Sequence, residues 1–168
     1  MEMRGGRNLW ILVSAVACGF TLPAMQLPES GDSVKGKALV ASHGCLGCHR
    51  ISDTGSRVGP NLSEIGARRT PERLQRSIVA PDEEVLAENR FVEVVLKDGS
   101  AVRGKLLNHD AMSVQLLDMK EHLRSFRTAE VRGYTILTKA LMPSFDAKLS
   151  PQELADIVAY LSSLKGTE

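Results

Sequence analysis

The most informative segment of the sequence is Cys45-Leu46-Gly47-Cys48-His49. Two thiols stand three positions apart, and an imidazole follows the second thiol directly. Three kinds of chemistry use such a pattern: a disulfide or redox dithiol, a metal site, and the covalent attachment of a cofactor. The segments on either side of the motif help to choose among them.

The spacing suits the covalent attachment of a haem. Two thiols three residues apart reach the two vinyl groups at one edge of a porphyrin, and the next residue is then held under the ring. A neutral imidazole at that position is a good ligand for iron. We therefore expect one covalently bound haem c, attached through Cys45 and Cys48, with His49 as the first axial ligand of the iron.

Three alternatives remain open. A redox dithiol would need a neighbouring βαβ pattern, which the sequence does not show. A zinc site would recruit His43 together with the three motif residues, although structural zinc usually draws on two separated ligand pairs. A plain disulfide between Cys45 and Cys48 is the third alternative.

Segments on both sides of the motif resemble class I cytochromes c. Gly36-Lys37-Ala38-Leu39-Val40 is similar to the N-terminal helix of that family, and Val58-Gly59-Pro60-Asn61-Leu62 is similar to its proline loop. The segment 155–161 is similar to its C-terminal helix. The resemblance implies that the Pro60 carbonyl accepts a hydrogen bond from the other ring nitrogen of His49.

The same resemblance implies a close crossing of the two terminal helices, with Ile157 and Tyr160 packed near Gly36. It also implies that Met142 is the second axial ligand, because Leu141-Met142-Pro143 stands just before the last helix, where the family carries its methionine. A thioether opposite a histidine raises the reduction potential, which suits electron transfer. The alternative is that Met142 fills the core, as most methionines do.

Two other methionines, Met112 and Met119, fall in or between expected strands, where no family precedent makes them ligands. The remaining histidines are interpreted as surface or packing residues: His43, His109 and His122.

Helix signals lie on both sides of a β-rich middle section. Gly31-Asp32-Ser33 offers an N-cap for a helix over 34–42. Thr70 and Pro71 begin a second helix, which must end before Pro81. Ser150-Pro151-Gln152-Glu153 forms a capping box for a last helix, whose apolar residues recur at helical spacing.

The middle section has a strand period. Asp98-Gly99 lies between two β-rich runs, which is a strong hairpin signal. The expected strands cover residues 91–96, 101–107, 112–117, 122–127 and 131–137. Short strands at this spacing favour a small antiparallel barrel or sandwich.

We therefore expect a mainly α cytochrome c fold with an inserted small antiparallel β-barrel, which is α+β overall. The haem domain would be split over 31–88 and 139–165, and the five-stranded insert would occupy 89–138. This arrangement resembles the planctomycete-type haem-binding domain, in which a Lys-Asp-Gly hairpin and a Met-Pro segment frame a β-rich insert before the axial methionine.

The N-terminus has the pattern of a targeting segment. Arg4 and Arg7 precede an apolar run over 9–20, which is short for a membrane span but suits a signal peptide. We expect residues 1–24 to direct export to the periplasm or another compartment outside the cytoplasm, with cleavage after Ala24. The alternatives are an uncleaved membrane anchor and lipidation at Cys18.

These features predict an electron carrier and not an enzyme. The chain would pass single electrons between a dehydrogenase or quinol-oxidising complex and an acceptor such as a respiratory complex or oxidase. The alternative is a haem-based gas sensor or small haem enzyme, which needs an open sixth position on the iron. A net charge of +1 gives no indication of nucleic-acid binding. The insert is either structural or a docking surface for a redox partner, whose candidate cations are Arg103, Lys105, Arg124, Arg127 and Arg132.

Overall fold

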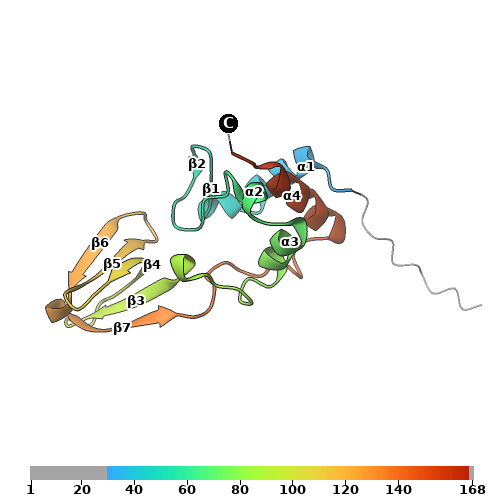
Figure 1. The fold of residues 1–168 in the computed structure, drawn as a ribbon. Coiled ribbons are helices and arrows are strands. Elements are labelled where there is room, and N and C mark those ends of the chain that lie inside the picture. The colour runs from blue at the N-terminus through green and yellow to red at the C-terminus, as the bar shows by residue number, and fades with distance from the viewer. Residues whose placement is uncertain (1–29, 167–168) are drawn as a thin grey trace, which may run out of the picture.

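The computed structural model describes residues 30–166 (Figure 1). The expected signal peptide or anchor at 1–24 lies outside these residues and stays a prediction. In the described part, no helix combines the length and the apolar character needed to cross a bilayer.

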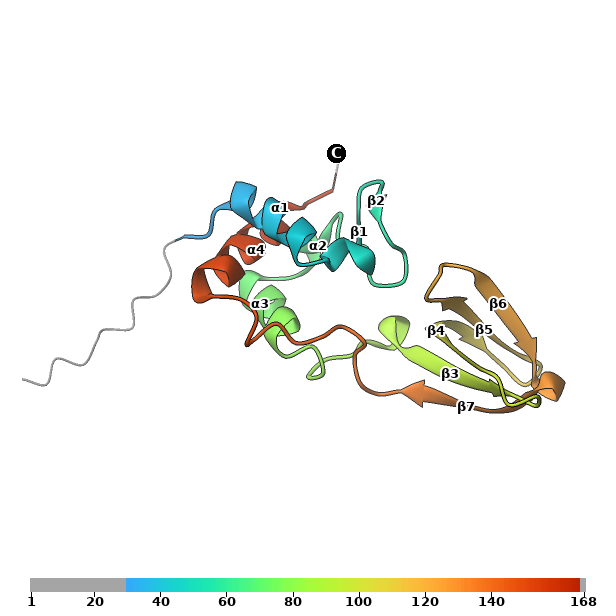
Figure 2. The same ribbon diagram turned by 180° about the vertical axis from the view of Figure 1, so that it is seen from behind.

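Along the chain, helices precede and follow a β-rich middle section (Figure 1). The helical elements are α1 (Ser33–Ser42), η1 (Cys45–Gly47), α2 (Ile65–Arg68), α3 (Pro71–Val79), η2 (Ala87–Asn89), η3 (Thr128–Glu130) and α4 (Pro151–Ser163). The strands are β1 (Arg50–Ile51), β2 (Thr54–Gly55), β3 (Phe91–Leu96), β4 (Ala101–His109), β5 (Ser113–Asp118), β6 (Leu123–Arg127) and β7 (Val131–Leu137). Strands β3 to β7 lie to one side of the α-helices, as the reverse view shows (Figure 2).

Local sequence explains where three of the helices begin. The Asp32 carboxylate caps α1, and the Thr70 hydroxyl caps α3, in which Pro71 takes the first position. Ser150 and Glu153 form the expected capping box of α4. These caps confirm the predicted helix starts. The short α2 and the β1–β2 hairpin carried no clear sequence signal.

Helices α1 and α4 cross closely at Gly36. A Cβ atom there would lie 2.0 Å from the carbonyl oxygen of Asp156 and 2.8 Å from Cβ of Tyr160, so only glycine fits. The buried Asp156 also accepts a hydrogen bond of 2.8 Å from the Asp32 backbone N–H, which ties α4 to the start of α1. The expected packing of Tyr160 near Gly36 is therefore present.

The helical part has its own hydrophobic core, to which α1, α3, α4 and the segment before α4 contribute. Its buried members are Val40, Leu74, Ile78, Phe145, Ile157, Val158 and Leu161.

The middle strands form an antiparallel sheet in the order β6-β5-β4-β3-β7. Strands β3 to β6 follow one another as hairpins, and β7 returns to pair with β3. This sheet has a second core, made by Val92, Val94, Val114, Leu116 and Phe126. All five expected strands are present, and the predicted bounds of β3 and β7 are those of the structure.

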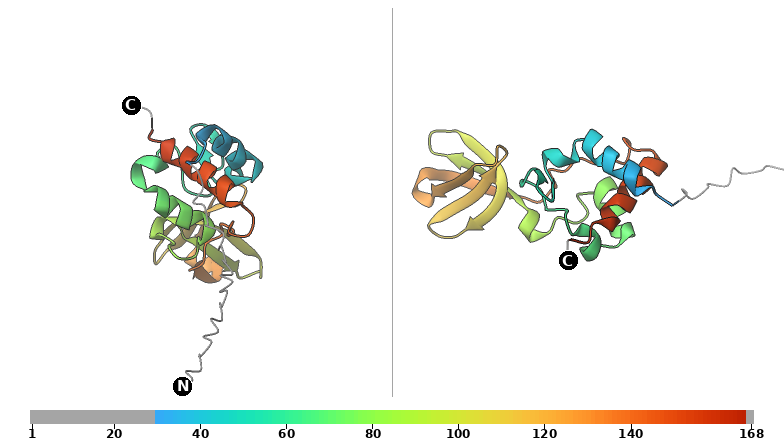
Figure 3. Two further views of the ribbon diagram at one scale, coloured as in Figure 1. Left: turned by 90° about the vertical axis from the view of Figure 1, so that its right-hand side faces the viewer. Right: turned by 90° about the horizontal axis from the view of Figure 1, so that it is seen from above.

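The expected closed barrel is not found. β6 and β7 are the two edges of the sheet, and no ladder joins them in the described part of the chain. Closure requires strand tilt and register stagger to match around the whole barrel, which a local pattern of β-rich runs does not specify. The described chain is α+β, with an open sheet beside the helices (Figure 3).

Candidate functional site

The Cys45–His49 motif forms a compact turn directly after α1. Gly44 adopts a left-handed conformation (φ 73°), and η1 begins after it. The backbone N–H of His49 then donates to the Cys45 carbonyl at 2.9 Å. The motif is therefore a tight loop that places two thiols and an imidazole close together in the chain.

The two thiols are not joined to each other. Cys45 is half-buried and packs against the helical core, whereas Cys48 is exposed. Burial raises the pKa of the Cys45 thiol, and the charge of Cys48 raises it further. A backbone hydrogen bond opposes both effects. A reactive redox dithiol has a lowered thiol pKa, so this environment does not favour that alternative.

His49 is held through one ring nitrogen. Its Nδ1 lies 2.9 Å from the Pro60 carbonyl oxygen, which can only accept a hydrogen bond, so the neutral ring carries its proton on Nδ1. Burial lowers the pKa of the imidazole, and the charge of Lys105 lowers it further. The hydrogen bond to Pro60 opposes both effects. The ring therefore stays neutral at pH 7 and leaves Nε2 unprotonated, as a metal ligand requires.

The loop that carries Pro60 is fastened to the motif by its own backbone. The N–H of Gly59 donates to the Cys48 carbonyl at 2.7 Å, and the N–H of Ser56 bonds the carbonyls of Leu46 and His49. A Cβ at Gly59 would lie 2.9 Å from the Cys48 oxygen and 3.0 Å from Nδ1 of His49. Glycine is thus required for this loop to come so near the imidazole.

Met142 lies on the segment between β7 and α4. It is half-buried and packs against the same core as Cys45. Backbone and side-chain bonds hold this segment to the end of α3: Phe145 N–H donates to the Ile78 carbonyl at 3.2 Å, and Ser144 Oγ donates to the Val79 carbonyl at 2.5 Å. The expected role of Met142 as a ligand stays a prediction.

These donors fit a haem of the c type. Two unlinked thiols offer thioether attachment, His49 offers a free Nε2, and a thioether ligand is present on the same core. Arg50, the next residue, has a buried Nε without a hydrogen-bond partner in the described residues, which a carboxylate of the cofactor would satisfy. In the same part of the chain, no three His, Cys, Asp or Glu side chains gather as a metal site, so the zinc alternative gains no support.

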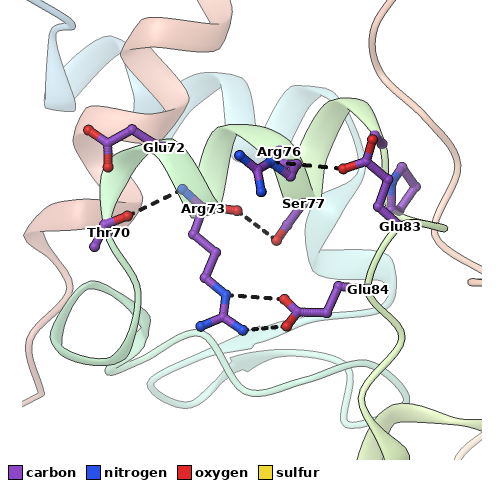
Figure 4. Close-up of a pocket in the computed structure, with 9 residues that line it drawn as sticks. Thr70, Glu72, Arg73, Arg76, Ser77, Glu83 and Glu84 are labelled. Carbon is purple, nitrogen blue, oxygen red and sulfur yellow. Dashed lines mark hydrogen bonds and ion pairs between the residues drawn. The ribbon is translucent and has the colours of Figure 1, made fainter.

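A charged hollow lies beside α3 (Figure 4), and none of its lining residues belongs to the candidate site. Its cations pair with its own carboxylates: Arg73 bonds Glu84, and Arg76 lies 3.8 Å from Glu83. Because these charges neutralise one another, the hollow adds nothing to the candidate site.

One contact between the sheet and the loop that carries Pro60 was not predicted from the sequence. Glu121, in the β5–β6 turn, accepts from the Arg57 backbone N–H at 3.3 Å and from Arg57 Nε at 3.1 Å. Arg57 belongs to the loop that carries Pro60. The partners are 64 positions apart, and neither stands in a motif, so no local signal could have identified them.

The family model of cytochrome c matches residues 33–93, which include the Cys45–His49 motif, the Pro60 loop and the start of β3. No curated protein matched the chain. The family match supports a cytochrome c domain and thus covalently bound haem c and haem-based electron transfer.

Proposed function

We propose that the chain is an exported mono-haem cytochrome c that carries single electrons. Cys45 and Cys48 would hold the haem covalently, and His49 and Met142 would be the axial ligands of its iron. The observation that carries this proposal is the bond of 2.9 Å from His49 Nδ1 to the Pro60 carbonyl, within a domain that matches cytochrome c.

When bound, the haem supplies the centre that gains and loses one electron. His49 presents Nε2 because Pro60 keeps the proton on Nδ1, and this bond makes the imidazole a stronger donor. Met142 would provide the second ligand, and the held segment of Ser144 and Phe145 limits its movement. Rigid ligands would suit electron transfer because little has to rearrange when the charge changes.

We further propose that the chain is of the planctomycete type, with the sheet of β3 to β7 as an insert in the loop before the methionine. Two observations support this assignment. The Lys97-Asp98-Gly99 turn joins β3 and β4, and Leu141-Met142-Pro143 follows β7 before the capped α4.

Its electron donor would be a dehydrogenase or a quinol-oxidising complex, and its acceptor a respiratory complex or oxidase. The basic and apolar pattern of residues 1–24 supports export to the periplasm, with a membrane or lipid anchor as the alternative. Purification from native membranes, with and without residues 1–24, distinguishes a soluble from an anchored carrier.

Optical spectra test the electron-carrier proposal. The protein is expressed with c-type haem maturation, and wild type and Met142→Ala are recorded oxidised, reduced, and reduced under carbon monoxide. We expect the wild-type haem to be low-spin and not to bind carbon monoxide. The Met142→Ala variant should lose the thioether–iron band and bind the gas. A high-spin wild type that takes up carbon monoxide would instead establish the sensor or enzyme alternative.

A further inference from the structure

A row of side chains crosses the whole sheet on the face opposite its core. The ladders pair Leu123 with Leu117, Leu117 with Lys105, Lys105 with Phe91, and Phe91 with Leu137. Side chains alternate between the two faces of a strand. Each residue of the row stands one or three positions from a residue that belongs to the sheet core or packs against it, so it points to the opposite face. Four apolar side chains and one cation therefore share a face that the sheet's own core does not use.

The solvent exposure of this row is unusual. Leu123 is 71% exposed, although leucine is a core residue by preference. Phe91 is only 8% exposed, yet it belongs to neither hydrophobic core. The row thus joins an exposed leucine to a buried phenylalanine that neither core uses, across the full width of the sheet.

Lys105, at the centre of the row, is half-buried and has no ion-pair partner among the described residues. The stem of a half-buried lysine can pack on apolar neighbours while its ammonium stays accessible to water or to an anion. Its neighbour two positions earlier on β4, Arg103, already pairs with Glu93. Lys105 is thus the cation of this face that is available to a ligand.

The row ends beside the candidate haem site. Leu117 and Leu123 flank the β5–β6 turn, and Glu121 in that turn is the residue that bonds the backbone and side chain of Arg57. Glu121 has a positive φ of 64°, which is uncommon for a residue with a side chain and requires support from its surroundings. Figure 2 shows this end of the sheet facing the β1–β2 segment.

We propose that this row is a wall of the haem pocket, with its leucines and Phe91 against the porphyrin and Lys105 paired to a haem carboxylate. A porphyrin offers what the row lacks: a flat apolar surface with carboxylates at one edge. The Glu121–Arg57 contact holds the wall against the loop that positions His49. This inference rests on the proposed function, and it gives the insert a role inside the haem site.

Redox titration of the holoprotein tests the role of Lys105. Removing a positive charge beside the haem favours the ferric state, so Lys105→Gln should lower the reduction potential. We expect a roughly tenfold rise in the ratio of ferric to ferrous haem at a fixed potential, which is about 59 mV for a one-electron couple. The matched control is Lys97→Gln, the same charge change in the β3–β4 turn, which should keep the wild-type potential.

Nuclear magnetic resonance of the reduced, diamagnetic holoprotein tests the apolar part of the wall. The methyl resonances of Leu117, Leu123 and Leu137 should be displaced by the porphyrin ring current, whereas those of the exposed Leu107 should not. Single Leu→Met variants assign the signals. A purely structural role for these residues would leave their resonances at ordinary positions.

The outcomes separate the two proposals. If the wild type carries no covalent haem, the proposed function and this inference both fail. If the wild type carries haem but Lys105→Gln behaves like Lys97→Gln and the leucine methyls show no ring-current shift, only the wall is wrong. The row would then be a surface for a protein partner.

Discussion

Nδ1 of His49 lies 2.9 Å from the carbonyl oxygen of Pro60, and Gly59 is the residue that allows this approach. A hydrogen bond from Nδ1–H makes the imidazole a stronger electron donor to a metal, which favours the oxidised iron. Under the proposed function, the geometry of one loop would therefore influence the reduction potential of the site.

Gly59→Ala should raise the reduction potential, because the added Cβ would collide with the Cys48 carbonyl and the His49 ring and force the loop away. Ligand affinity should fall by about 10- to 100-fold, as it does when such supporting bonds are lost. Redox titration measures the first effect, and acid titration of the low-spin spectrum, in which protonation removes the imidazole from the iron, measures the second. In Gly47→Ala, within the adjoining Cys45–His49 motif, an added Cβ would have no atom within 4 Å, so this control should behave as wild type. Equal potentials for the two variants would contradict the link.

Gly36→Ala should destabilise the crossing of α1 and α4. The new Cβ would need space that the Asp156 carbonyl and Tyr160 occupy, and overpacking of this kind costs about 1–3 kcal/mol. Urea denaturation of the holoprotein measures the loss. Gly133→Ala is the control, since a Cβ there would meet no atom within 4 Å, and this variant should be as stable as wild type or slightly more so. A Gly36→Ala protein of wild-type stability would show that the helices do not cross as described.

The sheet should depend on Leu116, which is fully buried in its core. Leu116→Ala leaves a cavity and should lower the free energy of unfolding by about 2–5 kcal/mol. Leu107→Ala, at a position 49% exposed, should change it by less than about 0.5 kcal/mol. Far-ultraviolet circular dichroism during urea denaturation follows both. Similar small effects for the two variants would mean that Leu116 is not a core residue.

Asp156 should make the stability of the protein sensitive to acid. The hydrogen bond from the Asp32 backbone N–H lowers the pKa of its carboxyl, the bond from Gln152 lowers it further, and burial opposes both. Because the folded pKa lies below the unfolded value of about 3.9, this stabilisation is present above that pH and is lost as the pH falls towards the folded pKa. Asp156→Asn removes the charge, so its stability should fall less steeply with acid in that window.

Urea midpoints between about pH 3 and pH 6 measure this slope. Asp146→Asn, an exposed residue of the segment before α4, is the control and should keep the wild-type slope. A slope for Asp156→Asn equal to that of wild type would contradict the role given to this carboxylate.

Much of the fold follows from local patterns in the sequence. The caps at Thr70-Pro71 and Ser150-Pro151 predict where α3 and α4 begin, and the alternation after Phe91 predicts the first strand of the sheet. These signals are reliable because each depends on residues within one turn or one strand. The pairing of β7 with β3 and the open edges depend on contacts between distant residues, and no local pattern specifies them.

The candidate site divides in the same way. The Cys45–His49 motif and the Pro60 loop are each continuous segments of the sequence, and Met142 stands just before the capped last helix. The sequence alone therefore indicates them as candidates. Arg57 and Glu121 meet only after the sheet has folded against the loop, and Lys105 lies among five cations that look alike in the sequence. Only the ladders of the sheet show that Lys105 stands in an apolar row.

The most direct test of the account asks whether the chain holds haem covalently. Wild type and a Cys45→Ser, Cys48→Ser double variant are expressed with c-type haem maturation, denatured, and separated from unbound haem before the mass and absorption of the chain are measured. We predict that one haem stays with the denatured wild type and that none stays with the double variant. A denatured wild-type chain without bound haem would contradict the claim that Cys45 and Cys48 hold haem covalently.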